Sequence, residues 1–65
     1  MAEAEKRDLT GSEIRALRAR LGLSKQAFGA LIGVSHMTVY RWERDQTSQH
    51  PVFAEKLRAL SRRAR

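Results

Sequence analysis

The sequence contains no cysteine, a single proline and no apolar run longer than three residues. Without cysteine the chain cannot form a disulfide, a cysteine-based zinc site or a thiol nucleophile. Its two histidines, His36 and His50, lie too far apart in the sequence for a closely spaced metal-binding pair, so we expect no bound metal. The short apolar runs exclude a transmembrane helix and the apolar block of a secretory signal. We therefore expect a cytoplasmic domain, nucleoid-associated if its source is a bacterium or a phage.

The short chain leaves little room for a binding cleft. It has 65 residues, and a domain of that size buries only about 60% of the surface that its unfolded chain exposes. We therefore expect no enzymatic activity, no cofactor and no small-molecule substrate. Stability has to come from a small apolar core.

Basic residues are in excess. The chain has 13 Lys and Arg residues against seven Asp and Glu residues, a formal net charge of +6. Such a charge on a small domain favours a polyanionic partner, with nucleic acid first and an anionic membrane surface second. Because Trp42 and the other large apolar residues are assigned to the core, no apolar face remains to enter a bilayer, and we expect no membrane partner.

Three helix starts are marked by one short pattern, in which an apolar residue precedes a hydroxyl residue and another apolar residue follows four positions later. The hydroxyl residues are Thr10, Ser24 and Ser35. A hydroxyl at the N-cap accepts from a free backbone N–H, and the flanking apolar side chains pack across the first turn. Glu13, three residues after Thr10, completes a capping box.

Helix ends are indicated by glycine. Gly22 and Gly33 each follow an apolar stretch and suit the left-handed conformation that ends a helix. Pro51 suits the first turn of a fourth helix. The period-two alternation typical of strands is absent, so we expect an all-α fold, a compact four-helix domain. The expected helices span 11–21, 24–32, 35–44 and 51–62.

Apolar residues recur at helical spacing in each of these segments. In the second segment the expected buried stripe consists of Phe28, Leu31 and Ile32. No single short helix can bury its stripe alone, so the four helices are expected to pack around a shared centre that contains Trp42 and Phe28.

The expected domain spans residues 9–62. Residues 1–8 have no large apolar side chain after Met1 and form a flexible or helical arm. Residues 63–65 form a basic tail. The arginines at this end have two open interpretations, because they either contact phosphates or complement the carboxyl end of the last helix. They are Arg62, Arg63 and Arg65.

The segment around Gly29 and Gly33 has the features of a helix-turn-helix. Glycine inside a helix is less stable than alanine by about 1 kcal/mol, so Gly29 indicates that another backbone passes close by. Gly33 then opens the turn before the next capped helix. The alternative is an ordinary helical hairpin in a small bundle.

The run LGLSKQAFGALIGVSHMTVYRWERD resembles the lambda-repressor/Cro-like (XRE-type) helix-turn-helix family, and the resemblance covers roughly residues 9–60. The sequence departs from the family pattern at three positions. Lys25 stands where the family often has glutamine, and Gly29 stands where alanine is usual. Asp45 stands where a glycine normally ends the third helix. The resemblance implies binding of double-stranded DNA with helix 35–44 in the major groove.

The resemblance also implies which residues contact DNA. If Val39 and Trp42 face the core, the helical wheel turns the polar face of helix 35–44 outward. The candidates for base contacts are His36, Met37, Tyr40, Arg41 and Arg44. The candidates for phosphate contacts lie at helix starts and in the loop before the last helix: Ser24, Lys25, Gln26, Ser35, Thr38, Thr47 and Ser48.

In this family an arginine of the first helix commonly pairs with a glutamate that ends the third. Arg18 and Glu43 stand at these positions. We expect a partly buried ion pair that orients the two helices and reads no base.

The expected function is sequence-specific binding of double-stranded DNA, by a transcriptional regulator or by an isolated or engineered DNA-binding domain on the same scaffold. Because little chain follows residue 62, we expect a monomer or a weak dimer that forms on DNA. The alternative is a protein-interaction module of an antitoxin or coactivator type with non-specific nucleic-acid binding.

Overall fold

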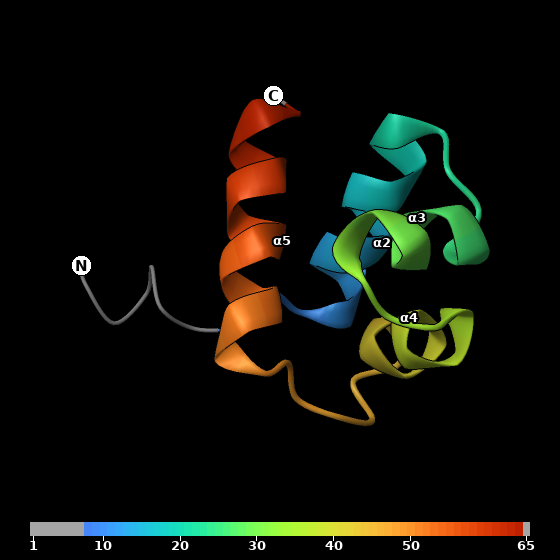
Figure 1. The fold of residues 1–65 in the computed structure, drawn as a ribbon, viewed down its shortest axis with the longest axis vertical. Coiled ribbons are helices and arrows are strands. Elements are labelled where there is room, and N and C mark those ends of the chain that lie inside the picture. The colour runs from blue at the N-terminus through green and yellow to red at the C-terminus, as the bar shows by residue number, and fades with distance from the viewer. Residues whose placement is uncertain (1–7, 65) are drawn as a thin grey trace.

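The computed structural model describes residues 8–64, and within that range the chain forms four helices and no strand. They are α2 (Gly11–Leu21), α3 (Lys25–Ile32), α4 (His36–Glu43) and α5 (Pro51–Arg63), as Figure 1 shows. The expected all-α fold is confirmed. The expected arm lies outside the described residues apart from Asp8, and so does Arg65 of the basic tail.

The first three helices begin at the hydroxyl caps. The side chains of Thr10, Ser24 and Ser35 each accept a hydrogen bond from the backbone N–H three residues later, at 3.1, 3.1 and 3.3 Å. The Glu13 carboxylate accepts a hydrogen bond from the N–H of Thr10 at 2.8 Å, which completes the capping box. Because Ser24 and Ser35 are the caps, α3 and α4 each begin one residue later than expected.

The helix ends follow the glycines at two of three places. Gly22 and Gly33 adopt left-handed conformations with φ of 68° and 105°. After α4 the left-handed residue is Asp45, with φ of 57°. The aspartate thus takes the conformation that the family pattern assigns to a glycine, which is a strained one for a residue with a Cβ atom.

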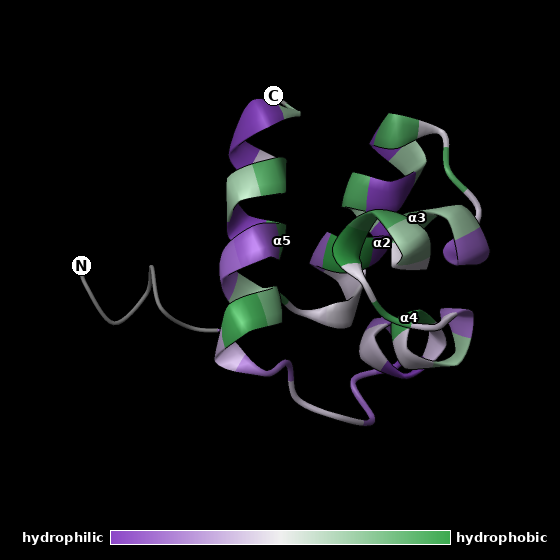
Figure 2. Cartoon of the chain, viewed as in Figure 1, coloured by the Kyte–Doolittle hydropathy of each residue, from purple (hydrophilic) through white to green (hydrophobic). Residues whose placement is uncertain are grey.

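All four helices contribute to one core. The largest fully buried side chains are those of Trp42, Phe28, Ile14, Leu57 and Val39. Trp42 and Phe53 bring their ring centroids within 6.1 Å of each other, joining α4 to α5. In Figure 2 the loop between α4 and α5 is mostly hydrophilic, and α5 alternates apolar with polar bands.

Gly29 brings α3 and α4 together. A Cβ atom placed on Gly29 would lie 2.5 Å from the carbonyl oxygen of Val34, closer than real side chains approach a backbone. The carbonyl of Gly29 also accepts from the N–H groups of Gly33 and Val34, at 2.7 and 2.8 Å. This tight turn between two capped helices confirms the expected helix-turn-helix.

The expectation that Leu31 faces the core is wrong, because the residue is 55% exposed. In a helix of 3.6 residues per turn, Leu31 points about 160° away from Gly29. The Gly29 side of α3 lies against the turn that precedes α4. Leu31 therefore faces solvent, while Phe28 and Ile32 fill the core.

Candidate nucleic-acid interface

Helix α4 presents one buried and one exposed face. Val39, Trp42 and Glu43 are buried. Their burial fixes the rotation of the helix about its own axis, so the outer face is held in one orientation. The five residues expected to contact bases are all exposed and share this outer face or its C-terminal end: His36, Met37, Tyr40, Arg41 and Arg44.

Two of these side chains contact each other. The guanidinium carbon of Arg44 lies 5.5 Å from the centre of the Tyr40 ring. At this distance the ring attracts the cation by a cation–π interaction. The guanidinium is therefore positioned along the last turn of α4.

The start of α3 presents backbone donors. Ser24 and Gln26 are exposed and Lys25 is half-buried. The hydroxyl of Ser24 is engaged as the N-cap, so the N–H groups of Lys25 and Gln26 are the unpaired donors that a helix start directs outward. Such a helix start favours an anion.

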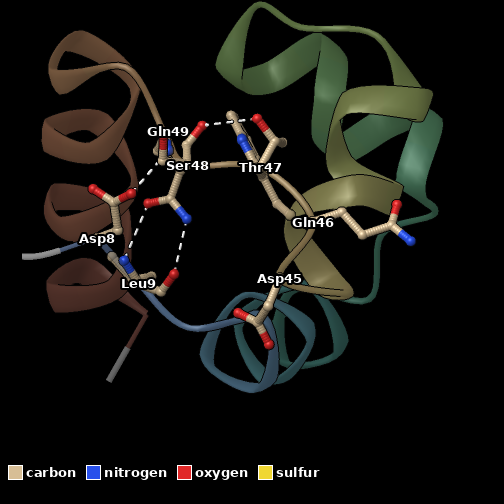
Figure 3. Close-up of a pocket in the computed structure, with 8 residues that line it drawn as sticks. Asp8, Leu9, Asp45, Gln46, Thr47, Ser48 and Gln49 are labelled. Carbon is tan, nitrogen blue, oxygen red and sulfur yellow. Dashed lines mark hydrogen bonds between the residues drawn. The ribbon is translucent and has the colours of Figure 1, made fainter.

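The remaining expected phosphate contacts are divided between two places. Ser35 is exposed and Thr38 half-buried at the start of α4, with their hydroxyl oxygens 3.4 Å apart. Thr47 and Ser48 are exposed in the α4–α5 loop, residues 45–50. The Thr47 hydroxyl donates to the Ser48 carbonyl at 3.5 Å (Figure 3).

The α4–α5 loop is held at both ends. At one end, Asp45 accepts a hydrogen bond from the N–H of Gly11 at 2.8 Å. At the other, the side-chain amide of Gln49 accepts from the Leu9 N–H at 3.1 Å and donates to the Leu9 carbonyl at 2.8 Å (Figure 3). The Gln49 N–H donates to Asp8 at 2.9 Å. The loop is therefore fixed to the segment that leads into α2.

Sequence reasoning missed Asp45 and Gln49 as anchors of this loop. In the sequence Asp45 stands out only as a departure from glycine. Gln49 is one residue of a polar stretch, yet in the structure it is buried, with 7% of its surface exposed. No local pattern distinguishes such a glutamine, since its partner Leu9 lies 40 residues away in sequence.

The anchored loop and Trp42 line a pocket of about 290 Å³.

The structure brings Arg18 and Glu43 together. Nε and Nη2 of Arg18 donate to the two carboxylate oxygens of Glu43 at 2.6 and 3.1 Å. Nη1 of Arg18 donates to the Leu23 carbonyl at 3.1 Å. The Glu43 side chain is 2% exposed and that of Arg18 is 20% exposed. This two-point contact joins α2 to the end of α4.

Several positive charges surround Glu43. Burial raises the pKa of its carboxyl, but the hydrogen bond and charge of Arg18, with the charges of Lys25 and Arg15, outweigh burial and hold that pKa below its ordinary value. The hydrogen bond to Glu43 in turn raises the pKa of the Arg18 guanidinium. Both groups are therefore charged at neutral pH.

The basic residues near the C-terminus lie away from this surface. Arg62 and Arg63 belong to the last turn of α5. Figure 1 shows that turn at the opposite end of the longest axis from α4 and the α4–α5 loop. At this position their charges can complement the carboxyl end of α5, which is one of the two interpretations given above. Among the described residues, no helix is both long enough and apolar enough to cross a membrane.

Comparisons with known proteins agree with this architecture. A helix-turn-helix family model matches residues 14–62. Repressor protein C2 of Salmonella phage P22 is 39% identical over 54 residues, which cover 83% of this chain and 24% of the phage protein. No solved structure gives a significant match. The chain belongs to the lambda-repressor/Cro-like (XRE-type) helix-turn-helix family of DNA-binding domains.

Proposed function

We propose that this chain binds double-stranded DNA sequence-specifically, with α4 in the major groove, as the DNA-binding domain of a transcriptional regulator. The observation that carries the proposal is the outer face of α4, where five polar or polarisable side chains are exposed on a helix whose inner face is fixed in the core. An α-helix fits the major groove of B-DNA, in which all four base pairs can be distinguished.

Three residues of the exposed face have chemistry suited to reading bases. Arg41 can donate two hydrogen bonds to O6 and N7 of guanine, which discriminates against other bases by about 1–3 kcal/mol. Met37 suits the methyl group of thymine, and His36 can donate to N7 of a purine or to a phosphate. Tyr40 and Arg44 complete the exposed face.

Phosphate contacts are proposed on both sides of α4. On one side they come from the start of α3, where free N–H groups accompany Ser24, Lys25 and Gln26. On the other they come from Thr47 and Ser48 of the anchored α4–α5 loop. Ser35 and Thr38 are proposed as further phosphate contacts at the start of α4. Such contacts set the position of α4 without reading sequence.

We further propose that the chain binds as a monomer or as a weak dimer assembled on DNA. Regulators with this motif commonly bind two half-sites one helical turn apart. A monomer gives the same affinity for a half-site whether the second half-site is present or not. A dimer assembled on DNA binds the double site cooperatively.

The test is selection of the purified chain against a random duplex pool, followed by affinity measurements on the enriched sequence. We expect one short motif to be enriched. If about four phosphates are neutralised, affinity for that motif falls roughly 100-fold between 50 and 200 mM salt. Enrichment of no motif, or salt-independent binding, contradicts the proposal and favours the protein-interaction alternative.

A further inference from the structure

Helices α2 and α5 finish at the same end of the molecule, the end away from α4 in Figure 1. Arg20 lies in the last turn of α2, while Arg62 and Arg63 lie in the last turn of α5, and all three are exposed. Leu21 and Ala64, next to these arginines, pack against the core, so the helix ends are held in place. We call Arg20, Arg62 and Arg63 the arginine end.

Among residues 8–64, no acidic side chain belongs to the helix turns that form the arginine end. Neither the last turn of α2 nor that of α5 contains an aspartate or glutamate. Within residues 8–64, none of the three arginines forms an ion pair. The acidic residues of the described range lie elsewhere. They are Asp8 before α2, Glu13 in its first turn, Glu43 and Asp45 at and just after the end of α4, and Glu55 in the first half of α5.

The positive charge of the arginine end exceeds what the helix ends require. Each helix carboxyl end carries about half a negative elementary charge, so the two ends together present about one. Three guanidinium groups leave a surplus of about two positive charges at these two helix ends. Complementing the helix dipoles therefore explains part of this charge and leaves the rest available for an anionic partner.

The arginine end does not act on the duplex that α4 would bind. The molecule is 32 Å long on its longest axis, and the two surfaces lie toward opposite ends of it (Figure 1). Charges in solution are screened over about 8 Å at physiological salt. A DNA duplex at α4 therefore gains little from Arg62 and Arg63, and the partner of the arginine end has to be a second molecule.

We propose that the arginine end binds the phosphate backbone of a second DNA duplex, so that one molecule bridges two duplexes. Guanidinium groups match phosphate oxygens in two-point hydrogen bonds, and the contact is independent of sequence. This inference rests on the proposed function, because α4 holds the first duplex. It assigns a separate, sequence-independent role to the charges near the C-terminus.

The experiment uses the full chain and two duplexes. One duplex carries the selected motif and is immobilised, while a fluorescent duplex without the motif is free in solution. The variant Arg62→Gln/Arg63→Gln removes two charges from the arginine end. Arg15→Gln/Lys56→Gln removes two exposed charges from the first halves of α2 and α5 and is the matched control. Affinity for the immobilised duplex and capture of the fluorescent duplex are measured separately, and circular dichroism checks the fold of each variant.

We expect the wild-type chain and the control variant to capture the fluorescent duplex. In Arg62→Gln/Arg63→Gln we expect capture of the fluorescent duplex to fall roughly tenfold, because two phosphate contacts disappear. The affinity of this variant for the immobilised duplex should stay within about twofold of wild type. Capture that is unchanged in this variant, or absent in the wild type while the immobilised duplex is bound, overturns the bridging proposal alone. Failure of the wild type to bind the immobilised duplex overturns the proposed function as well.

Discussion

The carboxylate of Asp45 accepts a hydrogen bond from the backbone N–H of Gly11 at 2.8 Å, and this contact joins the end of α4 to the start of α2. Asp45 holds a left-handed conformation that disfavours a side chain by about 1–2 kcal/mol. Its carboxylate offsets that strain, because it satisfies a free N–H and complements the positive end of α2. A Cβ atom on Gly11 would collide with the Glu43 carbonyl, so the two helix ends are also in close contact.

The first prediction concerns this contact. Asp45→Ala keeps the strained backbone and loses the hydrogen bond, so we expect the free energy of unfolding to fall by about 1–2 kcal/mol. In Asp45→Gly the relief of strain compensates for the lost hydrogen bond, and stability stays within about 1 kcal/mol of wild type. Urea denaturation measures both, with Gln46→Ala, at an exposed neighbour, as the control. Equal stability of Asp45→Ala and wild type would show that the carboxylate stabilises nothing.

The second prediction concerns the close approach of α3 and the following turn. Gly29→Ala gains about 1 kcal/mol of helix propensity but places a Cβ atom against the Val34 carbonyl, and overpacking of this kind costs about 1–3 kcal/mol. We expect a net loss of stability of about 1 kcal/mol. Ala30→Gly, at an exposed position of the same helix, calibrates the propensity term. A stabilised Gly29→Ala variant would mean that the turn moves away without strain.

The third prediction concerns Glu43. Glu43→Ala leaves the Arg18 guanidinium without its partner in a partly buried place, so we expect a loss of about 3 kcal/mol. In a domain of this size, that loss lowers the melting temperature by more than about 10 °C at pH 7. Differential scanning calorimetry measures the change. An unchanged melting temperature would exclude the pairing as a source of stability.

The pH dependence follows from the lowered pKa of Glu43. Since the folded state holds this carboxyl more strongly ionised than the unfolded state, its contribution is complete at neutral pH. The contribution is lost as the pH falls below about 4.3, the ordinary value for a glutamate, and through the folded-state pKa. We expect Glu43→Gln to flatten the acid limb of stability against pH. An acid limb that is the same for Glu43→Gln and wild type contradicts this assignment.

The fourth prediction concerns the contact between Tyr40 and Arg44. If the ring orients the guanidinium for DNA, Tyr40→Phe preserves affinity and Tyr40→Leu lowers it about threefold, the equivalent of a cation–π interaction near 0.5–1 kcal/mol. In an Arg44→Ala background, Tyr40→Leu should then have no further effect. Fluorescence anisotropy on the selected duplex measures all four variants. Equal losses in both backgrounds would indicate that Tyr40 contacts DNA directly.

The sequence predicted those parts of the fold that depend on local chemistry. Hydroxyl caps such as Thr10 and left-handed glycines such as Gly33 act on their own helix, so the helices follow from short patterns. Periodicity also predicted the outer face of α4, because Trp42 and Val39 determine its rotation. The anchors of the α4–α5 loop could not be found in this way. Asp45 and Gln49 act on partners 34 and 40 residues away, which only the folded chain brings together.

Leu31 is a residue that the sequence pattern predicts to be buried but that the structure exposes. Its spacing from Phe28 fits a buried stripe, yet the side chain is exposed because the close contact at Gly29 turns α3 the other way. An amphipathic stripe predicts which side of a helix is buried only to within about one residue of its edge. In α3 the close backbone contact at Gly29 determines which residues at the edge of the stripe are buried.

The proposed base recognition by the outer face of α4 depends most strongly on Arg41, whose guanidinium can bridge O6 and N7 of guanine. The measurement is parallel selection from one random duplex pool with the wild-type chain, Arg41→Ala, and Arg62→Ala as an arginine control at the far end. We predict that Arg41→Ala loses preference for a single guanine, a change of about 1–3 kcal/mol at that position, and keeps the rest of the motif. Arg62→Ala should keep the whole motif. An identical motif from wild type and Arg41→Ala would contradict the account.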